Sequence, residues 1–349
     1  MTREDIKRSD PNGMYECILE FPSQVQDAFN IGKNAKIPFK SRNFTNILLT
    51  GLGGSAIGGD LLRSYLSAEI GVPIIVNRHY RLPDFVDTKS LVIVSSYSGN
   101  TEETIAAQRD ATKRKAKILC ISTGGSVSEF ARKHKQVLIT TPGGLQPRAA
   151  LGYSFFPLLV ALSKMGFVRS KDKDIVETIT LLKKKSQEYA AAESGSNAAL
   201  KLALLMQGKL PAIYSAVEHF DSVNVRWRGQ IAENAKQLSF GHVLPEMNHN
   251  ELVGWNVLKD IMRRTVVLFL RDKETHPRIA TRENITREIL SRYSSGVEDV
   301  WSEGKSLLAR MFSLIYLGDW VSFYLAILNN QDPTPVDVID YLKTELAKV

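Results

Sequence analysis

At 349 residues the chain is long enough for two domains of ordinary size, each with its own core. A hydrophobic content of 44% and a charged content of 23% are those of a soluble globular protein. The formal net charge of +8 is spread along the chain, and no basic tract is interleaved with aromatic residues, so the composition argues against nucleic-acid binding and suits an anionic small substrate.

The cysteines and the N-terminus indicate the compartment. The two cysteines, Cys17 and Cys120, have no spacing typical of a metal site or a redox pair. The N-terminal residues lack an apolar signal region, and no stretch approaches 18 uncharged apolar residues. We therefore expect a cytoplasmic protein.

In chain order, residues 1–45 are expected to form a helical lead-in, and residues 46–165 a first domain in which strands alternate with helices. Strands such as 90–95 are continuously apolar, which indicates burial on both faces and hence a parallel, doubly wound sheet. The predicted strands are 46–50, 73–77, 90–95, 117–122 and 136–140, and the helices are 57–68, 101–114, 126–133 and 149–165.

Residues 166–195 are predicted to be a linker with an amphipathic helix at 175–188, and residues 196–349 a second domain of similar design. Two such lobes would leave a cleft between them. The second domain is predicted to contain strands at 212–216, 238–240, 265–270 and 296–301, a loop at 241–250, and helices at 197–207, 221–237, 280–290 and 307–328.

A glycine-rich turn follows the first strand. Gly51, Gly53 and Gly54 precede Ser55 and a helical pattern, a context in which backbone amides can converge on a phosphate. A dinucleotide fingerprint would need glycine at position 56, which is Ala56, and an acidic residue after the second strand, which ends in Asn77. A tight turn without a ligand is the alternative.

A second polar turn follows the strand at 90–95. It carries hydroxyls at Ser95, Ser96, Ser98 and Thr101, and Thr101 stands where a helix would be capped. Hydroxyls and a helix N-terminus without a phosphate-loop lysine favour holding a phosphate monoester rather than transferring it. The structural alternative is a well-capped helix whose serines fill the turn.

These two turns and four later motifs resemble the sugar-isomerase (SIS) domain family. The match extends from about residue 46 to the C-terminus and is similar to one branch, the bifunctional phosphoglucose/phosphomannose isomerases. The motifs that carry it are Gly53-Gly54-Ser55, the turn 96–102, the segment 147–153, Glu233-Asn-Ala-Lys236, the segment 245–251 and the tail 332–343.

The resemblance implies an α/β protein with two SIS-type subdomains, each a parallel doubly wound sheet flanked by helices. It implies a cofactor-free, metal-free aldose–ketose isomerase that interconverts glucose 6-phosphate and fructose 6-phosphate, and also mannose 6-phosphate and fructose 6-phosphate, through a cis-enediol. It further implies a place in glycolysis and gluconeogenesis. Gly54, Ser55, Ser96, Ser98 and Thr101 match the family's phosphate-binding residues.

The resemblance also assigns catalytic roles. Glu233 matches the base that moves a proton between C2 and C1, although a glutamate late in an amphipathic helix is by itself more typical of a solvated surface. Arg148 matches the arginine that stabilises the enediolate; its structural alternative is a helix-start arginine in water.

His249 and Lys343 match residues that open the sugar ring. The family's histidine comes from the neighbouring subunit, so the resemblance implies a homodimer with His249 contributed across the interface. Thr334 matches the threonine that admits the mannose epimer, but counting back from Lys343 leads equally well to Val336. His219 and His242 are expected to be structural.

Three other functions compete. His242, Glu246, His249 and Glu251 could ligate zinc, but Pro245 prevents one helical face from presenting them. A non-catalytic sugar-phosphate sensor would keep both turns, but the first 45 residues are too weakly patterned for a helix-turn-helix. Other SIS enzymes share the turns and are expected to lack the 245–251 and 332–343 motifs.

Overall fold

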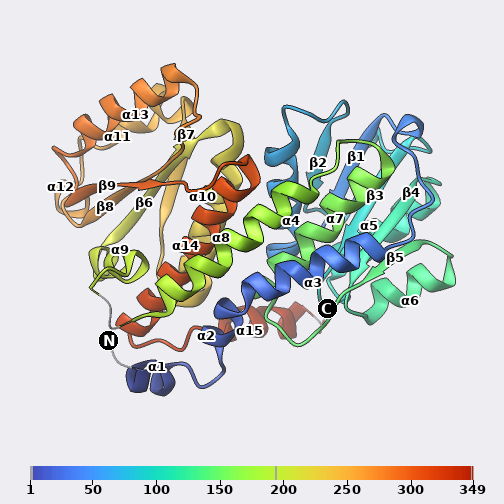
Figure 1. The fold of residues 1–349 in the computed structure, drawn as a ribbon, viewed down its shortest axis with the longest axis horizontal. Helices are drawn as coiled ribbons and strands as arrows, with labels where there is room; N and C mark the ends of the chain where they lie inside the picture. The colour runs from blue at the N-terminus through green and yellow to red at the C-terminus, as the bar shows by residue number, and fades with distance from the viewer. Residues whose placement is uncertain (1–2, 193–194, 347, 349) are drawn as a thin grey trace.

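A computed structural model describes residues 3–192, 195–346 and 348 of the chain. Two parallel β-sheets lie on opposite sides of a set of long helices, and further helices cover the outer face of each sheet (Figure 1). The predicted α/β fold with two parallel, helix-flanked sheets is therefore confirmed.

The first sheet contains β1 (Asn46–Thr50), β2 (Ile74–Asn77), β3 (Ser90–Ser95), β4 (Lys117–Ser122) and β5 (Val137–Thr140). The second contains β6 (Leu210–Ala216), β7 (Phe240–Leu244), β8 (Thr265–Arg271) and β9 (Gly296–Trp301). The α-helices are α1 (Arg3–Ser9), α2 (Met14–Leu19), α3 (Phe21–Asn34), α4 (Gly53–Leu66), α5 (Glu102–Lys113), α6 (Gly125–Lys133), α7 (Leu151–Met165), α8 (Asp172–Ala190), α9 (Ala198–Met206), α10 (Val217–Ala235), α11 (Glu251–Gly254), α12 (Lys259–Met262), α13 (Pro277–Leu290), α14 (Leu307–Leu328) and α15 (Asp337–Leu346). Three short 3₁₀ turns are η1 (Ser41–Asn43), η2 (Pro147–Ala149) and η3 (Glu246–His249).

The first sheet has the strand order β2-β1-β3-β4-β5, all parallel. Ile47 and Leu49 of β1 pack into the core that contains α4 and α7, whereas Leu48 between them packs on the side of α5 and α6. Since successive side chains of a strand point to opposite faces, the uninterrupted apolar strand satisfies both layers.

The second sheet repeats this arrangement in the order β7-β6-β8-β9. In both sheets the strand order reverses beside the first strand, between β1 and β3 and between β6 and β8. In such sheets ligands bind outside the carboxyl ends of the strands at the point of reversal. In the first sheet that point coincides with the two polar turns.

The central helices form one apolar core shared by both lobes. The helix predicted at 307–328 is found as α14 with the same bounds, and it is long and apolar enough by composition to span a membrane. However, 94% of its most apolar window is buried inside the protein, as in the core helix of a globular domain. The predicted linker segment contains α8, which packs on α14, so the boundaries at 45, 165 and 195 remain a prediction.

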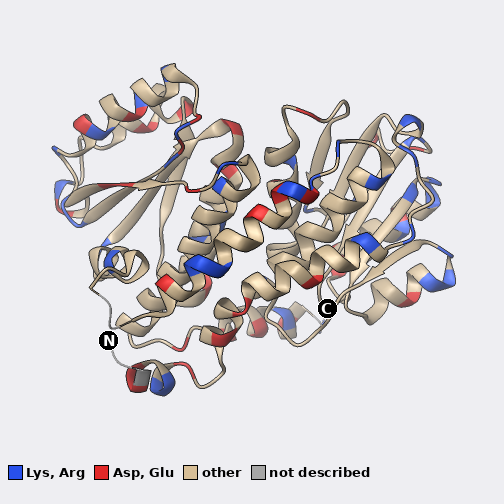
Figure 2. Ribbon diagram, in the orientation of Figure 1, with Lys and Arg blue, Asp and Glu red and all other residues tan. Residues whose placement is uncertain are grey.

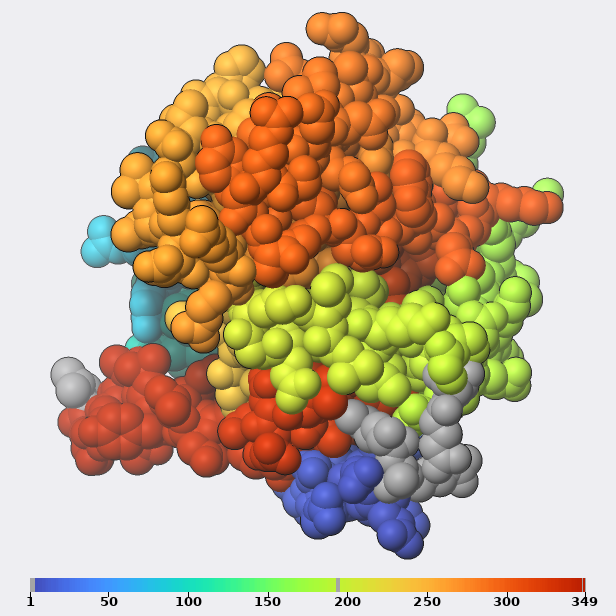
Figure 3. Space-filling view, turned by 90° about the vertical axis from the view of Figure 1, so that its left-hand side faces the viewer, coloured from blue at the N-terminus to red at the C-terminus, as the bar shows by residue number. Residues whose placement is uncertain are grey.

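Three predicted elements differ in the structure. The helix expected from residue 57 already begins at Gly53, so the glycine turn forms its first turn. The loop expected at 241–250 is wrong, because β7 extends to Leu244 and η3 follows it. A helix was expected at the C-terminal end of the second domain, and it is found as the exposed α15, which projects from the body of the molecule at the lower left of Figure 3 rather than packing within that domain.

Charged residues of both signs are distributed along the ribbon of both lobes (Figure 2). This distribution agrees with the even spread of charge along the sequence.

The pairing of β7 with β6 requires a glycine at position 241. A Cβ at this glycine would lie 2.1 Å from the carbonyl oxygen of Ile213 on β6. We expect Gly241→Ala to lower the free energy of unfolding by about 2–3 kcal/mol, because the strands must separate to relieve the overlap. Urea denaturation measures the effect.

Gly296→Ala is the matched control, because Gly296 also lies in a strand of this sheet and a Cβ there would meet nothing within 4 Å. Its unfolding free energy should change by less than about 1 kcal/mol. Equal effects of the two substitutions would contradict the close contact between β6 and β7.

Candidate active site

The two polar turns meet at the carboxyl ends of β1 and β3. The Ser55 hydroxyl accepts a hydrogen bond from the Tyr97 N–H at 3.1 Å, which joins the turns. The helices that follow the turns, α4 and α5, have no side-chain cap at their N-termini. Two uncapped N-termini side by side present backbone N–H groups and partial positive charge to an anion.

The second turn is folded back on itself through its hydroxyls. Ser96 is buried, and its Oγ lies 3.0 Å from Thr101 Oγ1 and accepts from the Gly99 N–H. Ser98 is exposed, and its Oγ accepts from the Asn100 N–H. The four candidate hydroxyls of Ser55, Ser96, Ser98 and Thr101 therefore belong to one connected structure.

Gly54 connects this structure to the next part of the site. A Cβ at Gly54 would lie 2.4 Å from the carbonyl oxygen of Pro147, so only glycine permits the approach of η2. Arg148, in η2, is thereby placed beside the N-terminus of α4.

Arg148 is buried, with only 3% of its surface exposed, and is held by two parts of the chain, the end of α10 and the tail after α14. Its Nε donates to Asn234 Oδ1 at 2.7 Å, and its Nη2 donates to the carbonyls of Pro333 and Thr334, both at 2.7 Å. Its Nη1 lies 3.4 Å from Glu233 Oε2. Burial lowers the pKa of Arg148, and the neighbouring Glu233 opposes that shift.

Glu233 lies near the end of α10, where its side chain remains one-third exposed. It lines two cavities. One of about 200 Å³ also contains Gly53, Gly54 and Arg148, and the other, of about 520 Å³, is bounded by residues 331–339. A carboxylate that is accessible, paired with a buried guanidinium and close to an anion site can exchange protons with a bound ligand.

The tail after α14 forms part of the same site. Val336 lines the larger cavity with Glu233, whereas Thr334 contributes its carbonyl to Arg148. The Thr334 Oγ1 is buried without a hydrogen-bond partner among the described residues. Thr334 lines neither cavity, so this hydroxyl gains a hydrogen bond only if substrate binding brings a polar group to it.

The structure does not bring His249 and Lys343 to Glu233 within one subunit. His249 is exposed in η3 after the carboxyl end of β7, whereas Glu233 precedes the amino end of that strand. Lys343 lies on the projecting helix α15, is 69% exposed and pairs with Asp340 at 3.3 Å. Their assigned roles remain predictions.

The other candidate metal ligands, and His219, make local contacts. His242 Nδ1 accepts from the Val243 N–H, Glu246 accepts from Asn250, and Glu251 accepts from the Tyr214 hydroxyl. His219 Nδ1 lies 2.8 Å from the Ser64 carbonyl. Within the described parts of the chain no group of three or more His, Cys, Asp or Glu residues is arranged to hold a metal ion.

A stripe of buried polar side chains on α10 was missed by sequence reasoning. Arg226, Gln230 and Asn234 are spaced four residues apart, which places them on one face of the helix. Arg226 and Gln230 donate to Asp319 in the apolar helix α14, and Asn234 donates to Ser322 there and accepts from Arg148. The four-residue spacing was a signal that could have found them.

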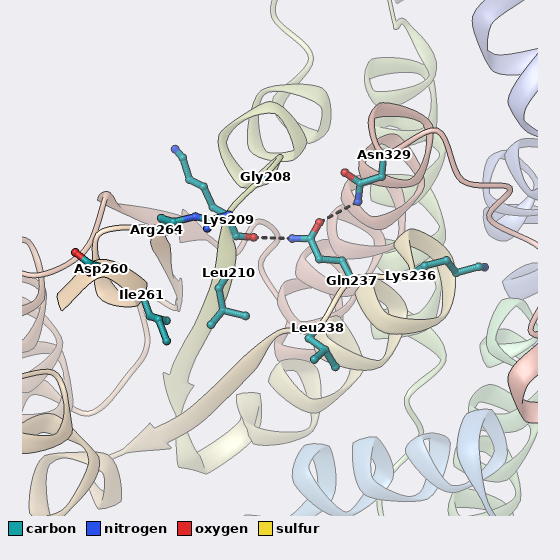
Figure 4. A pocket seen from close by; sticks show the side chains of 10 residues that line it. All are labelled: Gly208, Lys209, Leu210, Lys236, Gln237, Leu238, Asp260, Ile261, Arg264 and Asn329. Atoms are coloured by element: carbon teal, nitrogen blue, oxygen red, sulfur yellow. Dashed lines mark hydrogen bonds between the residues drawn. The ribbon is translucent and has the colours of Figure 1, made fainter. Parts of the chain in front are cut away.

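A larger cavity of about 580 Å³ lies at the amino ends of β6 and β8 (Figure 4). Gln237 spans it, donating to the Lys209 carbonyl and accepting from Asn329. Because ligands of parallel sheets bind at carboxyl ends, this cavity is not assigned to the candidate site.

Comparison with known proteins adds to this geometry. A bifunctional phosphoglucose/phosphomannose isomerase from Caldicellulosiruptor bescii is 48% identical over 96% of this chain and 99% of its own length. The chain belongs to this family. A second relative of the same name, from Thermoplasma acidophilum, is 35% identical over 88% of this chain and 92% of its own.

Residues 195–346 match the family described as the bacterial phospho-glucose isomerase C-terminal SIS domain. A solved glucose-6-phosphate isomerase-like protein from Thermus thermophilus superimposes with a TM-score of 0.63 at 18% identity, covering 98% of both chains. At that identity the superposition supports the fold alone. The family assignment places the chain among the isomerases.

Proposed function

We propose that the protein interconverts glucose 6-phosphate and fructose 6-phosphate, and mannose 6-phosphate and fructose 6-phosphate. The observation that carries the proposal is the Arg148–Glu233 pair, which lies in one cavity with the N-terminus of α4. The relatives named for these two activities support the choice of substrates.

In this proposal Gly54, Ser55, Ser96, Ser98 and Thr101 hold the phosphate ester. The phosphate stays attached to C6 throughout, so the turns need only bind it. Their hydroxyls and the uncapped N-termini of α4 and α5 match that requirement.

Glu233 is proposed as the base. It removes the proton from C2 of the open-chain aldose, while the electrons of that C–H bond form the C1–C2 double bond of a cis-enediol. The C1 carbonyl oxygen takes up a proton as the enediol forms. The carboxylic acid then returns its proton to C1 while the C2 hydroxyl loses its proton and its oxygen becomes the carbonyl, so that one proton passes in net from the C2 oxygen to the C1 oxygen. No redox cofactor is needed, because the electrons stay within the C1–C2 unit. Rotation about C2–C3 lets the same base serve both aldose epimers.

Arg148 is proposed to stabilise the negative charge on the enediolate oxygens. Its contacts with Asn234 and the carbonyls of Pro333 and Thr334 fix the guanidinium before substrate arrives. A donor fixed in advance costs no reorganisation during the reaction.

Ring opening is proposed to use His249 from a second subunit together with Lys343. The chain after His249 exposes the apolar residues Val253, Val257 and Leu258, and α15 exposes Val338 and Tyr341. Apolar surfaces of this kind mark interaction sites more often than free surface. They support a homodimer in which the partner completes the site.

The cytoplasmic location expected from the sequence is also proposed. Both cysteines are free thiols, which suits a reducing compartment. There the reaction would serve glycolysis and gluconeogenesis.

The role of Glu233 predicts the effect of Glu233→Gln. We expect kcat to fall by about 10³-fold with both aldose phosphates, because glutamine cannot accept the C2 proton. A coupled assay with chelator present measures turnover, and calorimetry should show that fructose 6-phosphate still binds.

Glu218→Gln is the matched control, because Glu218 lies on the same helix outside both cavities. It should retain wild-type turnover. Normal turnover of Glu233→Gln would remove the mechanism. Binding without turnover in the wild type would instead favour the sugar-phosphate sensor, and turnover only of amino-sugar phosphates another SIS enzyme.

The unpartnered hydroxyl of Thr334 predicts a change in epimer preference. Thr334→Val should lower the mannose-to-glucose ratio of kcat/KM by about tenfold, because the substrate loses a hydrogen-bond partner. Its unfolding free energy should rise by about 1 kcal/mol without ligand, since a buried unpaired hydroxyl is removed. If Val336→Ala changes the ratio and Thr334→Val does not, the role belongs to Val336.

The shared site predicts complementation between two inactive variants. Glu233→Gln and His249→Asn subunits, mixed, unfolded and refolded together, should regain about a quarter of wild-type activity, because half the dimers are mixed and each has one intact site. Either variant refolded alone is the control. Differently tagged subunits show whether mixed dimers have formed. If they have formed and activity does not recover, Glu233 and His249 belong to the site of the same subunit.

A further inference from the structure

Arg78 lies in the proposed substrate cavity, and none of the proposed catalytic steps uses it. It directly follows β2 and lines the cavity of about 200 Å³ with Gly53, Gly54 and Glu233. Its side chain is 47% exposed, so the guanidinium is open to solvent and to ligands.

The other two arginines of this cavity are already committed. Arg148 is buried and bonded to Asn234 and to two carbonyls, and Arg226 is buried and paired with Asp319 at 2.9 Å. The Arg226 guanidinium therefore serves the protein interior, and the Arg148 guanidinium is fixed in place beside Glu233. Arg78 is the accessible one of the three.

The backbone around Arg78 is held at both ends. Asn77 is buried, and its Nδ2 donates to the His79 carbonyl at 2.9 Å, which shapes the turn after β2. Further on, Arg114 of α5 donates to the carbonyls of Leu82 and Pro83. The loop is thus anchored on the first lobe while the Arg78 side chain lines the cavity.

The two polar turns that are proposed to bind the phosphate contain no cationic residue. Neither the segment 51–57 nor the segment 95–101 contains lysine or arginine. A phosphate monoester carries nearly two negative charges at neutral pH, and guanidinium pairs with it in a bidentate geometry. We propose that Arg78 is a substrate-binding residue that pairs with the phosphate of the sugar phosphate.

Asp60 is the ion-pair partner of Arg78 in the structure. The two side chains form an ion pair between α4 and the turn after β2, and the Asp60 carboxylate is only 15% exposed. Substrate binding then replaces a carboxylate partner by a phosphate partner within one cavity. The inference deepens the proposed function and rests on it, since it takes a sugar phosphate as the ligand.

The test is Arg78→Gln, assayed for isomerisation of fructose 6-phosphate and for competitive inhibition by inorganic phosphate. We expect KM and the inhibition constant of inorganic phosphate each to rise about tenfold, because a charge-assisted contact to the phosphate is lost. The value of kcat should stay within about twofold, because Arg78 does not act on C1 or C2.

Two further variants separate binding from structural support. Asp60→Asn breaks the ion pair but keeps Arg78, so the inhibition constant of phosphate should stay the same or fall. Arg81→Gln removes an exposed arginine of the same loop that does not line the cavity, and it should change nothing. Thermal unfolding of each variant checks that the fold is intact.

An unchanged inhibition constant in Arg78→Gln would overturn the inference. So would an Asp60→Asn variant that weakens phosphate binding as much as Arg78→Gln, because Arg78 would then act only through its ion pair. If the wild type does not isomerise these sugars, the proposed function fails on its own, and calorimetric titration with inorganic phosphate still decides the role of Arg78.

Discussion

The candidate site depends on one buried cation. Arg148 is held by Asn234 on α10, by two carbonyls after α14 and by the ion pair with Glu233. A buried guanidinium is costly unless nearly every donor is matched, so these contacts must form together. Through them η2, α10 and the C-terminal tail, which are far apart in sequence, are placed around one cavity.

Other charged groups in the interior are also matched by hydrogen-bond partners. The helical layer between the two sheets is largely apolar, and within it the polar stripe of α10 meets Asp319 and Ser322 of α14. Burial raises the pKa of Asp319, and Arg226 opposes the shift. The Arg226 guanidinium also donates to the Arg148 carbonyl, so the charged core supports the backbone of the site as well as its side chains.

The two lobes share a strand order but not the same chemistry. At the reversal point of the first sheet, glycines and hydroxyls leave two helix N-termini open. The corresponding cavity of the second sheet is lined by Glu218, Asp272 and Glu274, with Arg310 paired to Asp272. Acidic side chains there disfavour an anion, so of the two equivalent positions only the one in the first sheet suits the proposed phosphate site.

Much of the architecture could be predicted from the local sequence. Continuously apolar strands such as β3 predicted burial on both faces, and β1, β3, β4, β9 and α14 have the predicted bounds. The strand predicted at 238–240 was placed too early, because Gly241, His242 and the following Pro245 are locally typical of a loop, and only pairing with β6 makes 240–244 the strand β7. The two polar turns were visible because each directly follows a strand.

What the sequence by itself determined is therefore most of the elements, the two polar turns that are proposed to bind phosphate and, through its motifs, the family. Which distant residues meet was decided only by the tertiary structure. The partners of Arg148, the stripe facing Asp319 and the position of Arg78 in the cavity have no local signature that names their partners. The reason is physical: strand and helix patterns arise from neighbours along the chain, whereas a buried charge is stabilised by whichever donors and acceptors folding brings around it.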